Sequence, residues 1–184
     1  MPFTHTEMVN LDYAASTPLR LSAIDAQCEY DNGPLAGVNP NSLHSLGRAA
    51  AQKLEGCRRS LAQTLGRSVR PSEVIFTGGG TEANAMALLG IAEGARQSNK
   101  HRTRVLISAI EHDSMLDNIP LLHAAGFTTD LILPNSHGVI EAKTLASMMD
   151  DSVALVSVML ANNETGAVQP IADLAACAHE YGAY

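Results

Sequence analysis

The chain has 184 residues, 46% of them hydrophobic, and a formal net charge of −7. That length is enough to bury one sizeable core. The negative charge, with no block of lysine and arginine, argues against a surface built for nucleic acid or for an anionic membrane. No apolar run approaches the ~18 residues of a membrane span. The N-terminal segment MPFTHTEMVN lacks the basic and apolar regions of a signal peptide, so we expect a cytoplasmic protein.

Residues 1–40 differ in composition from the rest of the chain. They contain Pro18, Gly33, Pro34, Gly37 and Pro40. This density of helix breakers predicts an N-terminal arm with one short helix near residues 21–30, followed by a loop. Residues 41–184 instead alternate between helical and strand patterns, and we predict that they belong to a separate, larger domain.

A long helix is predicted at the start of this larger domain. Asn41 or Ser42 is the candidate N-cap, and Gly66 is the candidate terminating residue. Between them, apolar residues recur at i+3 and i+4 spacing, which is typical of a helix with one buried face. These residues are Leu43, Leu46, Ala50, Leu54, Cys57, Leu61 and Leu65. Pro71 then leads into a β-rich run, residues 73–77, which predicts a short strand.

Helices and strands alternate through the remainder of the sequence. Helices are expected at residues 81–98, 141–149 and 170–181, and a helical stretch that Pro120 interrupts is expected at 114–125. Strands are expected at residues 104–110, 127–133 and 153–159, the last of them so apolar that both its faces should be buried. This order predicts the α/β class, with a mainly parallel sheet between helices on both faces, a three-layer α/β/α fold.

The three cysteines, Cys28, Cys57 and Cys177, form no CxxC motif and no cluster with histidine, so we predict no metal site. Cys57 falls on the apolar stripe of the long helix, and Cys177 lies within another expected helix. Both positions favour small core residues over reactive thiols. Cys28 is harder to place, and none of the three has the electropositive surroundings of a catalytic thiol.

Three segments follow predicted strands and should lie at the carboxyl edge of the sheet, where open α/β sheets bind ligands. They are residues 78–82, 111–112 and 162–166. In the first segment, Gly78-Gly79-Gly80 lets the backbone approach a ligand closely, and Thr81 opens a helix whose free N–H groups favour a phosphate. The run matches neither GxGxxG nor GxxxxGK[ST]. A flexible turn with no ligand is the alternative interpretation.

His112 and Asn163 are the other candidates at this edge. A lone histidine at a strand end is more often a structural hydrogen-bonding residue, but beside a phosphate site it could lie flat against an aromatic cofactor. Asn162 and Asn163 have a turn as their simplest explanation, because asparagine tolerates the conformations that turns require. The functional alternative is hydrogen bonding to a cofactor or substrate.

Taken together, these segments resemble the N-terminal half of a cysteine desulfurase, a pyridoxal-phosphate enzyme of the class V aminotransferase group with fold type I. The matching segments, in order over essentially the whole chain, are LDYAASTP (11–18), NPNSLH (39–44), VIFTGGGTEAN (74–84), EH (111–112) and NNETGAVQP (162–170). NPNSLH and NNETG favour a desulfurase over other class V members. The resemblance implies that residues 41–184 form an incomplete part of the large cofactor-binding domain.

The resemblance also implies roles for individual residues. Gly80 and Thr81 would bind the phosphate of pyridoxal 5'-phosphate, His112 would stack on its pyridine ring and take part in proton transfer, and Asn163 would hydrogen-bond near the 3-hydroxyl and the substrate. The family commonly has Ser-Gly-Ala where this chain has Gly78-Gly79-Gly80. Glycine preserves the backbone N–H contacts there but removes one possible hydroxyl ligand.

Other groups of the family lie beyond the matched part. These are the aspartate that pairs with the pyridine nitrogen, the Schiff-base lysine within Ser-x-His-Lys, and the nucleophilic cysteine. The lysines of this chain, Lys53, Lys100 and Lys143, stand in no matching context. We therefore expect the chain to be inactive by itself and doubt that it holds the cofactor without that lysine.

For a complete enzyme, the resemblance implies conversion of L-cysteine to L-alanine, with the sulfur passed to an enzyme cysteine as a persulfide. A sulfur-acceptor protein would then receive it for iron–sulfur cluster or thio-cofactor assembly, and family members are homodimers. Two alternatives remain. One is another class V enzyme, such as a selenocysteine lyase or an aminotransferase, and the other is a non-catalytic truncated paralogue.

Overall fold

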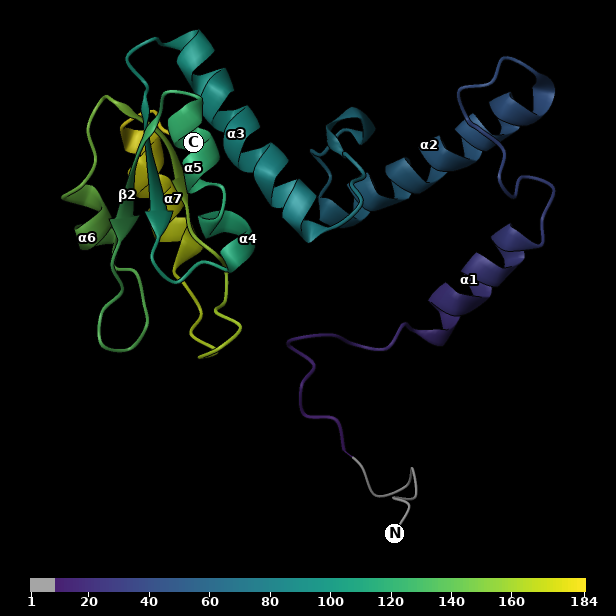
Figure 1. Ribbon diagram of the computed structural model, residues 1–184, viewed down its shortest axis with the longest axis horizontal. Coiled ribbons are helices and arrows are strands. Elements are labelled where there is room, and N and C mark those ends of the chain that lie inside the picture. The colour runs from purple at the N-terminus through teal and green to yellow at the C-terminus, as the bar shows by residue number, and fades with distance from the viewer. Residues whose placement is uncertain (1–8) are drawn as a thin grey trace. The chain divides into compact units, whose positions relative to one another are not determined.

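The computed structural model describes residues 9–184, so the interpretation of the first eight residues lies outside it. The described chain forms two compact units, one ending at Phe76 and one spanning Thr77–Tyr184 (Figure 1). The predicted domain boundary between residues 40 and 41 stays a prediction. Within residues 9–184, no helix is both long enough and apolar enough to cross a membrane.

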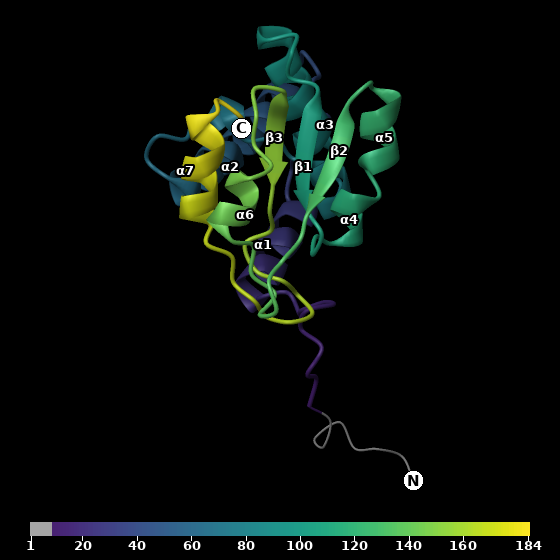
Figure 2. The same cartoon turned by 90° about the vertical axis from the view of Figure 1, so that its left-hand side faces the viewer.

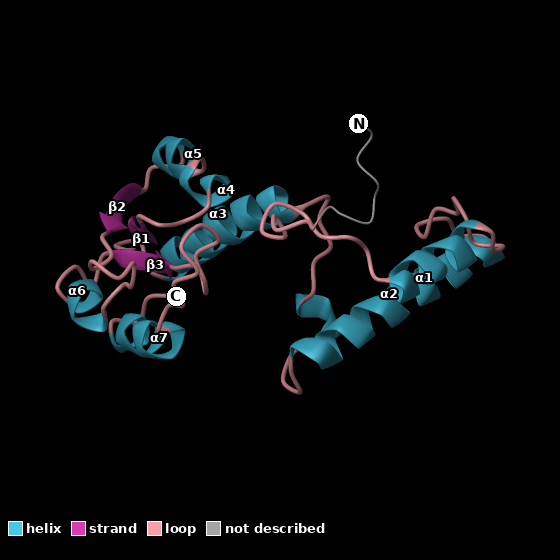
Figure 3. Cartoon of the chain, turned by 90° about the horizontal axis from the view of Figure 1, so that it is seen from below, coloured by secondary structure: helices cyan, strands magenta, loops and turns pink. Residues whose placement is uncertain are grey.

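Residues 9–76 contain two α-helices and one short 3-10 helix. They are α1 (Leu21–Asp31) and α2 (Ser45–Leu65), which Figure 3 labels, and η1 (Pro71–Glu73). The predicted short helix and the end of the long helix at Gly66 are confirmed. The predicted N-cap is wrong, because His44 caps α2 by accepting a hydrogen bond from Gly47 N at 3.2 Å. A Cβ on Gly47 would lie 2.1 Å from Ser42 O. The backbone at Ser42 therefore packs against the first turn of α2, and Ser42 is not part of the helix.

The apolar stripe of α2 is mostly exposed in this structure. Ala50 is buried, but Leu43 is 90% exposed and Leu65 is 68% exposed. Cys57 is exposed as well, so the prediction that it is a core residue is wrong. The physical reason is that residues of α1, of the loop after it and of α2 line an open pocket, which includes Tyr30 and Cys57, instead of a closed core.

The predicted strand at residues 73–77 is also wrong. Pro71–Glu73 forms the 3-10 helix, and residues 74–77 form no strand. A strand needs a neighbour to satisfy its backbone groups, and here the carbonyl of Val74 accepts a hydrogen bond from the Arg58 guanidinium instead. The same guanidinium lies 4.8 Å from the centre of the Phe76 ring. The glycine run therefore does not follow a strand in this structure.

The second unit is built on a parallel sheet with strand order β2-β1-β3. Its strands are β1 (Arg104–Ser108), β2 (Thr128–Ile132) and β3 (Val153–Ser157), and Figure 2 shows them side by side. The predicted positions and the parallel arrangement are confirmed. Tyr184 covers part of the β3 edge that faces away from β1, since its amide donates to Ala154 O at 3.1 Å and its carbonyl accepts from Val156 N at 2.8 Å.

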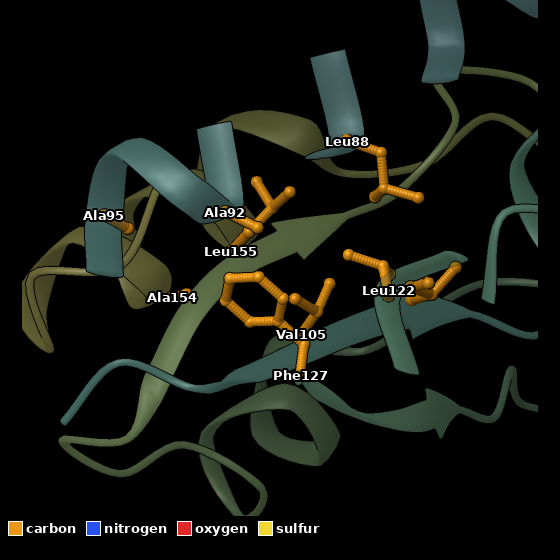
Figure 4. Close-up of a cluster of buried hydrophobic side chains, with 9 residues drawn as sticks. Leu88, Ala92, Ala95, Val105, Leu122, Phe127, Ala154 and Leu155 are labelled. Carbon is orange, nitrogen blue, oxygen red and sulfur yellow. The ribbon is translucent and has the colours of Figure 1, made fainter. Parts of the chain in front are cut away.

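Helices cover both faces of this sheet. They are α3 (Gly80–Ser98), α4 (Asp113–Leu116), α5 (Ile119–Ala124), α6 (Ala142–Ala146) and α7 (Ile171–Glu180). Successive side chains of β1 point to opposite faces. Val105 and Ile107 join a buried cluster with Leu88 of α3 (Figure 4), whereas Leu106 joins a second cluster with Leu174 of α7. The three-layer α/β/α fold is confirmed.

Two local predictions in this unit are confirmed by particular residues. The helical stretch at 114–125 is divided into α4 and α5, and Pro120 lies in the first turn of α5, where its missing N–H is not needed. Cys177 is partly buried and packs against the second cluster, as expected for a small core residue.

Candidate functional site

Two hydrogen bonds join the start of α3 to the segments that follow β1 and β3. Asn84, in the first turns of α3, donates a hydrogen bond from Nδ2 to Ser114 Oγ at 2.8 Å, just beyond β1. Asn162, beyond β3, donates from Nδ2 to Ile110 O at 2.9 Å. These two contacts bring the start of α3, the segment after β1 and the segment after β3 together.

The glycine loop presents an open backbone at the start of α3. Gly79 and Gly80 are exposed, and a Cβ on either would meet no atom within 4 Å. The first hydrogen bond of the helix runs from Ala83 N to Gly79 O at 3.1 Å. Among residues 9–184, the amides of Gly79, Gly80 and Thr81 have no acceptor. Such amides at the positive end of a helix dipole attract anions.

The loop also contains its own anionic group. Glu82 Oε2 accepts a hydrogen bond from Gly78 N at 2.6 Å, so the amide of Gly78 is occupied. Thr77 Oγ1 donates to Gly79 O at 3.0 Å and holds the turn before the helix. The amides left as donors for a phosphate are those of Gly79, Gly80 and Thr81. The residues present fit the phosphate group that the sequence predicts.

His112 caps α4 and keeps its ring exposed. Its Nδ1 accepts hydrogen bonds from Ser114 N at 3.0 Å and lies 2.9 Å from Ser114 Oγ. Ser114 is buried, so one side of the imidazole is held by the protein and the remainder faces solvent. An exposed ring at this edge fits contact with a flat ligand. The hydrogen bonds also mean that His112 has a structural role in capping α4.

Glu111 connects the segments after β1 and β3. Its Oε1 accepts hydrogen bonds from Ser108 Oγ at 2.8 Å and from Met159 N at 2.5 Å. A carboxylate that accepts from the end of β1 and from the segment after β3 fixes the spacing of the two at the edge. Glu111 therefore supports His112, its neighbour in sequence, instead of facing a ligand itself.

The two asparagines of the last segment differ in environment. Asn162 is buried, and its Oδ1 accepts from Glu164 N at 3.0 Å and from Thr165 N at 2.8 Å. It holds the loop in shape. Asn163 is exposed, and its Nδ2 donates to Glu164 Oε1 at 3.1 Å. Asn163 is thus the one of the pair whose amide is accessible to a ligand.

Asn84 and Ser114 are site residues that the sequence does not point out. They are separated by 30 positions, and no local pattern indicates that they touch. One indication exists for Ser114, because the spacing His-x-Ser is compatible with a side chain capping an amide two residues later. The partner of Ser114 becomes known only when α3 is packed on the sheet.

The lysines of the second unit do not contact these residues. Lys100 follows the C-terminus of α3, at the opposite end of that helix from the glycine loop. Lys143 pairs with Glu141, with Nζ 2.9 Å from Oε2. Within residues 77–184, therefore, no ammonium group lies in contact with His112 or the glycine loop.

Comparisons with known proteins agree with this fold. The class-V aminotransferase family model matches residues 9–184. An IscS-like cysteine desulfurase of Mycobacterium tuberculosis is 39% identical over 178 residues, which is 95% of this chain and 44% of that protein. A solved structure of a NifS-like protein has a TM-score of 0.81 and 29% identity, and it covers 92% of this chain and 44% of that one. A structure of SspA in complex with cysteine has a TM-score of 0.80 and 29% identity, with 93% and 47% covered.

The chain thus spans less than half the length of each of these relatives. The family match, in contrast, extends over all the described residues, including the glycine loop, His112 and Asn163. The fold, the carboxyl-edge site and the family match lead to the same conclusion: the chain belongs to the class-V aminotransferase family.

Proposed function

We propose that this chain provides the phosphate-binding and ring-contacting part of a pyridoxal-phosphate-dependent cysteine desulfurase. The observation that supports the proposal is that hydrogen bonds join the first turns of α3 to the segment after β1, through Asn84 and Ser114, and that segment to the one after β3, through Ile110 and Asn162. The relative from Mycobacterium tuberculosis is named a cysteine desulfurase, and the SspA structure contains cysteine. Both names support L-cysteine as the substrate.

Each candidate residue has a task in this proposal. The amides of Gly80 and Thr81 donate to the phosphate oxygens, and the helix dipole of α3 favours the negative charge. His112 lies against the cofactor ring, and Asn163 donates from its amide to the ring's hydroxyl oxygen or to the substrate. Bound pyridoxal phosphate supplies the electron-withdrawing ring that stabilises negative charge at the substrate α-carbon.

His112 is also the proton-transfer group of this proposal. Its Nδ1 is occupied by Ser114, so any proton that it exchanges with the substrate passes through Nε2. Imidazole suits this task because its ring nitrogens can both take up and release a proton. Among residues 9–184, no hydrogen-bond partner occupies Nε2, which leaves that atom accessible.

The complete reaction and its partners follow from the same proposal. L-Cysteine and an enzyme thiol give L-alanine and an enzyme persulfide, and the outer sulfur then passes to an acceptor protein for iron–sulfur cluster assembly. We place this reaction in the cytoplasm and in a homodimer. The Schiff-base lysine and the thiol are not supplied by residues at the edge described above.

The experiment that tests the activity uses the complete product of the gene that encodes this sequence. Purified with pyridoxal 5'-phosphate and given L-cysteine and a thiol reductant, it should release sulfide and alanine in equal amounts. Selenide from selenocysteine, with little sulfide from cysteine, would instead indicate a selenocysteine lyase. No release from either substrate by a protein that binds the cofactor would contradict the proposed activity.

A binding experiment on the 184-residue chain tests the phosphate loop separately. Inorganic phosphate should shift the amide NMR resonances of residues 79–81. Gly79→Val should abolish this shift because its side chain fills the open cradle, while the fold is kept because a Cβ there meets no atom. Gly94→Val is the matched control, since it lies on the same helix and a Cβ there also meets no atom. Equal phosphate binding in both variants would contradict the assignment.

A further inference from the structure

A continuous set of hydrogen bonds links the helix that carries the glycine loop to the imidazole of His112. Asn84 Nδ2 donates to Ser114 Oγ at 2.8 Å. Ser114 Oγ lies 2.9 Å from His112 Nδ1, and Ser114 N donates to the same nitrogen at 3.0 Å. Ser114 is buried and Asn84 is partly buried, so both contacts are partly shielded from water.

The direction of each hydrogen bond follows from the chemistry of the donors. A backbone N–H can only donate, so His112 Nδ1 is an acceptor and carries no hydrogen. The hydroxyl of Ser114 accepts from Asn84 and therefore has its own hydrogen available for Nδ1. A neutral imidazole with a bare Nδ1 has its hydrogen on Nε2.

We propose that Asn84 and Ser114 are positioning residues that hold His112 as the neutral Nε2–H tautomer, with its ring oriented at the carboxyl edge of the sheet. The relay runs Asn84 to Ser114 to His112 Nδ1. It starts on α3, one turn after Thr81. The helix that begins at the glycine loop therefore also orients the His112 ring.

The consequence for ligand binding rests on the function proposed above. With Nδ1 occupied, the imidazole cannot rotate about its bond to Cβ without losing two hydrogen bonds. The ring is therefore already ordered before a flat ligand arrives, which lowers the entropic cost of stacking. Nε2–H remains free to donate a hydrogen bond to the substrate. Once Nε2 has given up its own proton, it can accept one from the substrate.

The relay itself can be tested by NMR on the 15N-labelled 184-residue chain without any cofactor. At a pH where the ring is neutral, His112 should show the Nε2–H tautomer and a scalar coupling across the hydrogen bond between Ser114 N and His112 Nδ1. An Nδ1–H tautomer, or the absence of that coupling in the folded chain, would overturn the proposal.

Asn84→Asp is the most informative variant, because it has the same shape but its carboxylate only accepts hydrogen bonds. The Ser114 hydroxyl should turn to the carboxylate and release Nδ1, whose 15N resonance then moves downfield while the coupling to Ser114 N persists. Ser114→Ala should move the resonance in the same direction, and Ser114→Thr should restore it. An unchanged resonance in both Asn84→Asp and Ser114→Ala would overturn the relay.

Asn99→Asp is the matched control for the change in charge. Asn99 caps the other end of α3, and its Oδ1 accepts from His101 N at 3.1 Å, a contact that aspartate retains. This variant should leave the His112 resonances unchanged. An equal shift in Asn99→Asp would show that charge alone moves the resonance, against the relay.

Adding pyridoxal 5'-phosphate to the labelled complete gene product separates the relay from the proposed function. The ring current of a stacked cofactor should shift the His112 resonances, and Asn84→Asp should raise the half-saturating concentration several-fold. If the wild-type tautomer and coupling are as expected but the cofactor causes no shift, the cofactor role of His112 fails while the relay stands. An equal half-saturating concentration in the two proteins would contradict the positioning role.

Discussion

The helices of the second unit bury their apolar faces on a sheet, whereas α2 of the first unit carries an equally regular stripe that stays exposed. Leu88 of α3 and Leu174 of α7 are almost fully buried, but Leu61 of α2 is 43% exposed. Among residues 9–76, the buried hydrophobic residues are Ala50 and Ala62. Amphipathic spacing thus predicts a helix in both units, but it does not say whether the unit provides a surface to cover the stripe.

The largest expected effect is the loss of stability when a buried leucine of the second unit is truncated, compared with an exposed leucine of the first. Leu106→Ala should destabilise the second unit by roughly 2–5 kcal/mol, because it opens a cavity in a packed cluster. Leu61→Ala, on the exposed stripe, should change the stability of the first unit by less than about 0.5 kcal/mol. Urea unfolding, followed by the amide NMR resonances of each unit, measures both. Equal losses would remove the contrast between the units.

The next largest effect is the loss of stability when the arginine of an arginine–phenylalanine pair is replaced, and each unit contains one such pair. Arg96 lies 4.2 Å from the ring centre of Phe127, which is 2% exposed, and Arg58 lies 4.8 Å from that of Phe76, which is 44% exposed. Arg96→Met should cost about 2 kcal/mol and Arg58→Met about 0.5–1 kcal/mol, since a cation–π contact is stronger against a ring that is shielded from water. The same urea experiment measures them, and a larger loss for Arg58→Met would reverse the comparison.

The elements of the second unit were predictable because their determinants are local. The apolar run of β3, the proline that divides α4 from α5 and the alternation of helix with strand each lie within a few residues. The strand predicted at residues 73–77 is absent because strand formation depends on a partner, and Arg58 satisfies Val74 instead. β propensity without a neighbour is therefore weak evidence for a strand.

The candidate site was predictable in outline for a related reason. Parallel strands end at one edge, so segments after β1 and β3 must meet there wherever they lie in the sequence. Which residue of a segment faces a ligand depends on contacts across the fold. Asn162 binds Ile110 O, 52 positions away, and this leaves Asn163 exposed. Likewise, the contact of Asn84 with Ser114 becomes evident only in the folded chain.

A smaller effect is expected in the reactivity of the cysteines. Burial, and to a lesser degree the charge of Glu180, raises the pKa of the Cys177 thiol in the second unit. Cys57, in the first unit, is exposed. Because the thiolate is the reactive form, iodoacetamide at neutral pH should modify Cys57 several-fold faster than Cys177. Peptide mass spectrometry over time gives both rates, and faster modification of Cys177 would mean that α7 opens readily.

The smallest effect is the acid sensitivity of one carboxyl in each unit. In the second unit, hydrogen bonds from the Ser152 hydroxyl and amide, together with the charge of Arg104, lower the pKa of Asp150. In the first unit, Arg70 lowers the pKa of Glu73. A carboxyl whose pKa is lower in the folded state stabilises that state above its unfolded pKa, and this contribution is lost as the pH falls through the folded pKa.

Both carboxyls are exposed, so solvent screening keeps each contribution small. Asp150→Asn should therefore slightly reduce the stability of the second unit at neutral pH and flatten its decline in acid, with no change in the first unit. Glu73→Gln should have the same two effects on the first unit and leave the second unit unchanged. Urea midpoints of each unit, measured from neutral pH to below the ordinary carboxyl pKa range, test this. If either substitution altered the acid response of both units equally, the two units would be unfolding as one, and the contrast in their cores would have to be explained within a single cooperative structure.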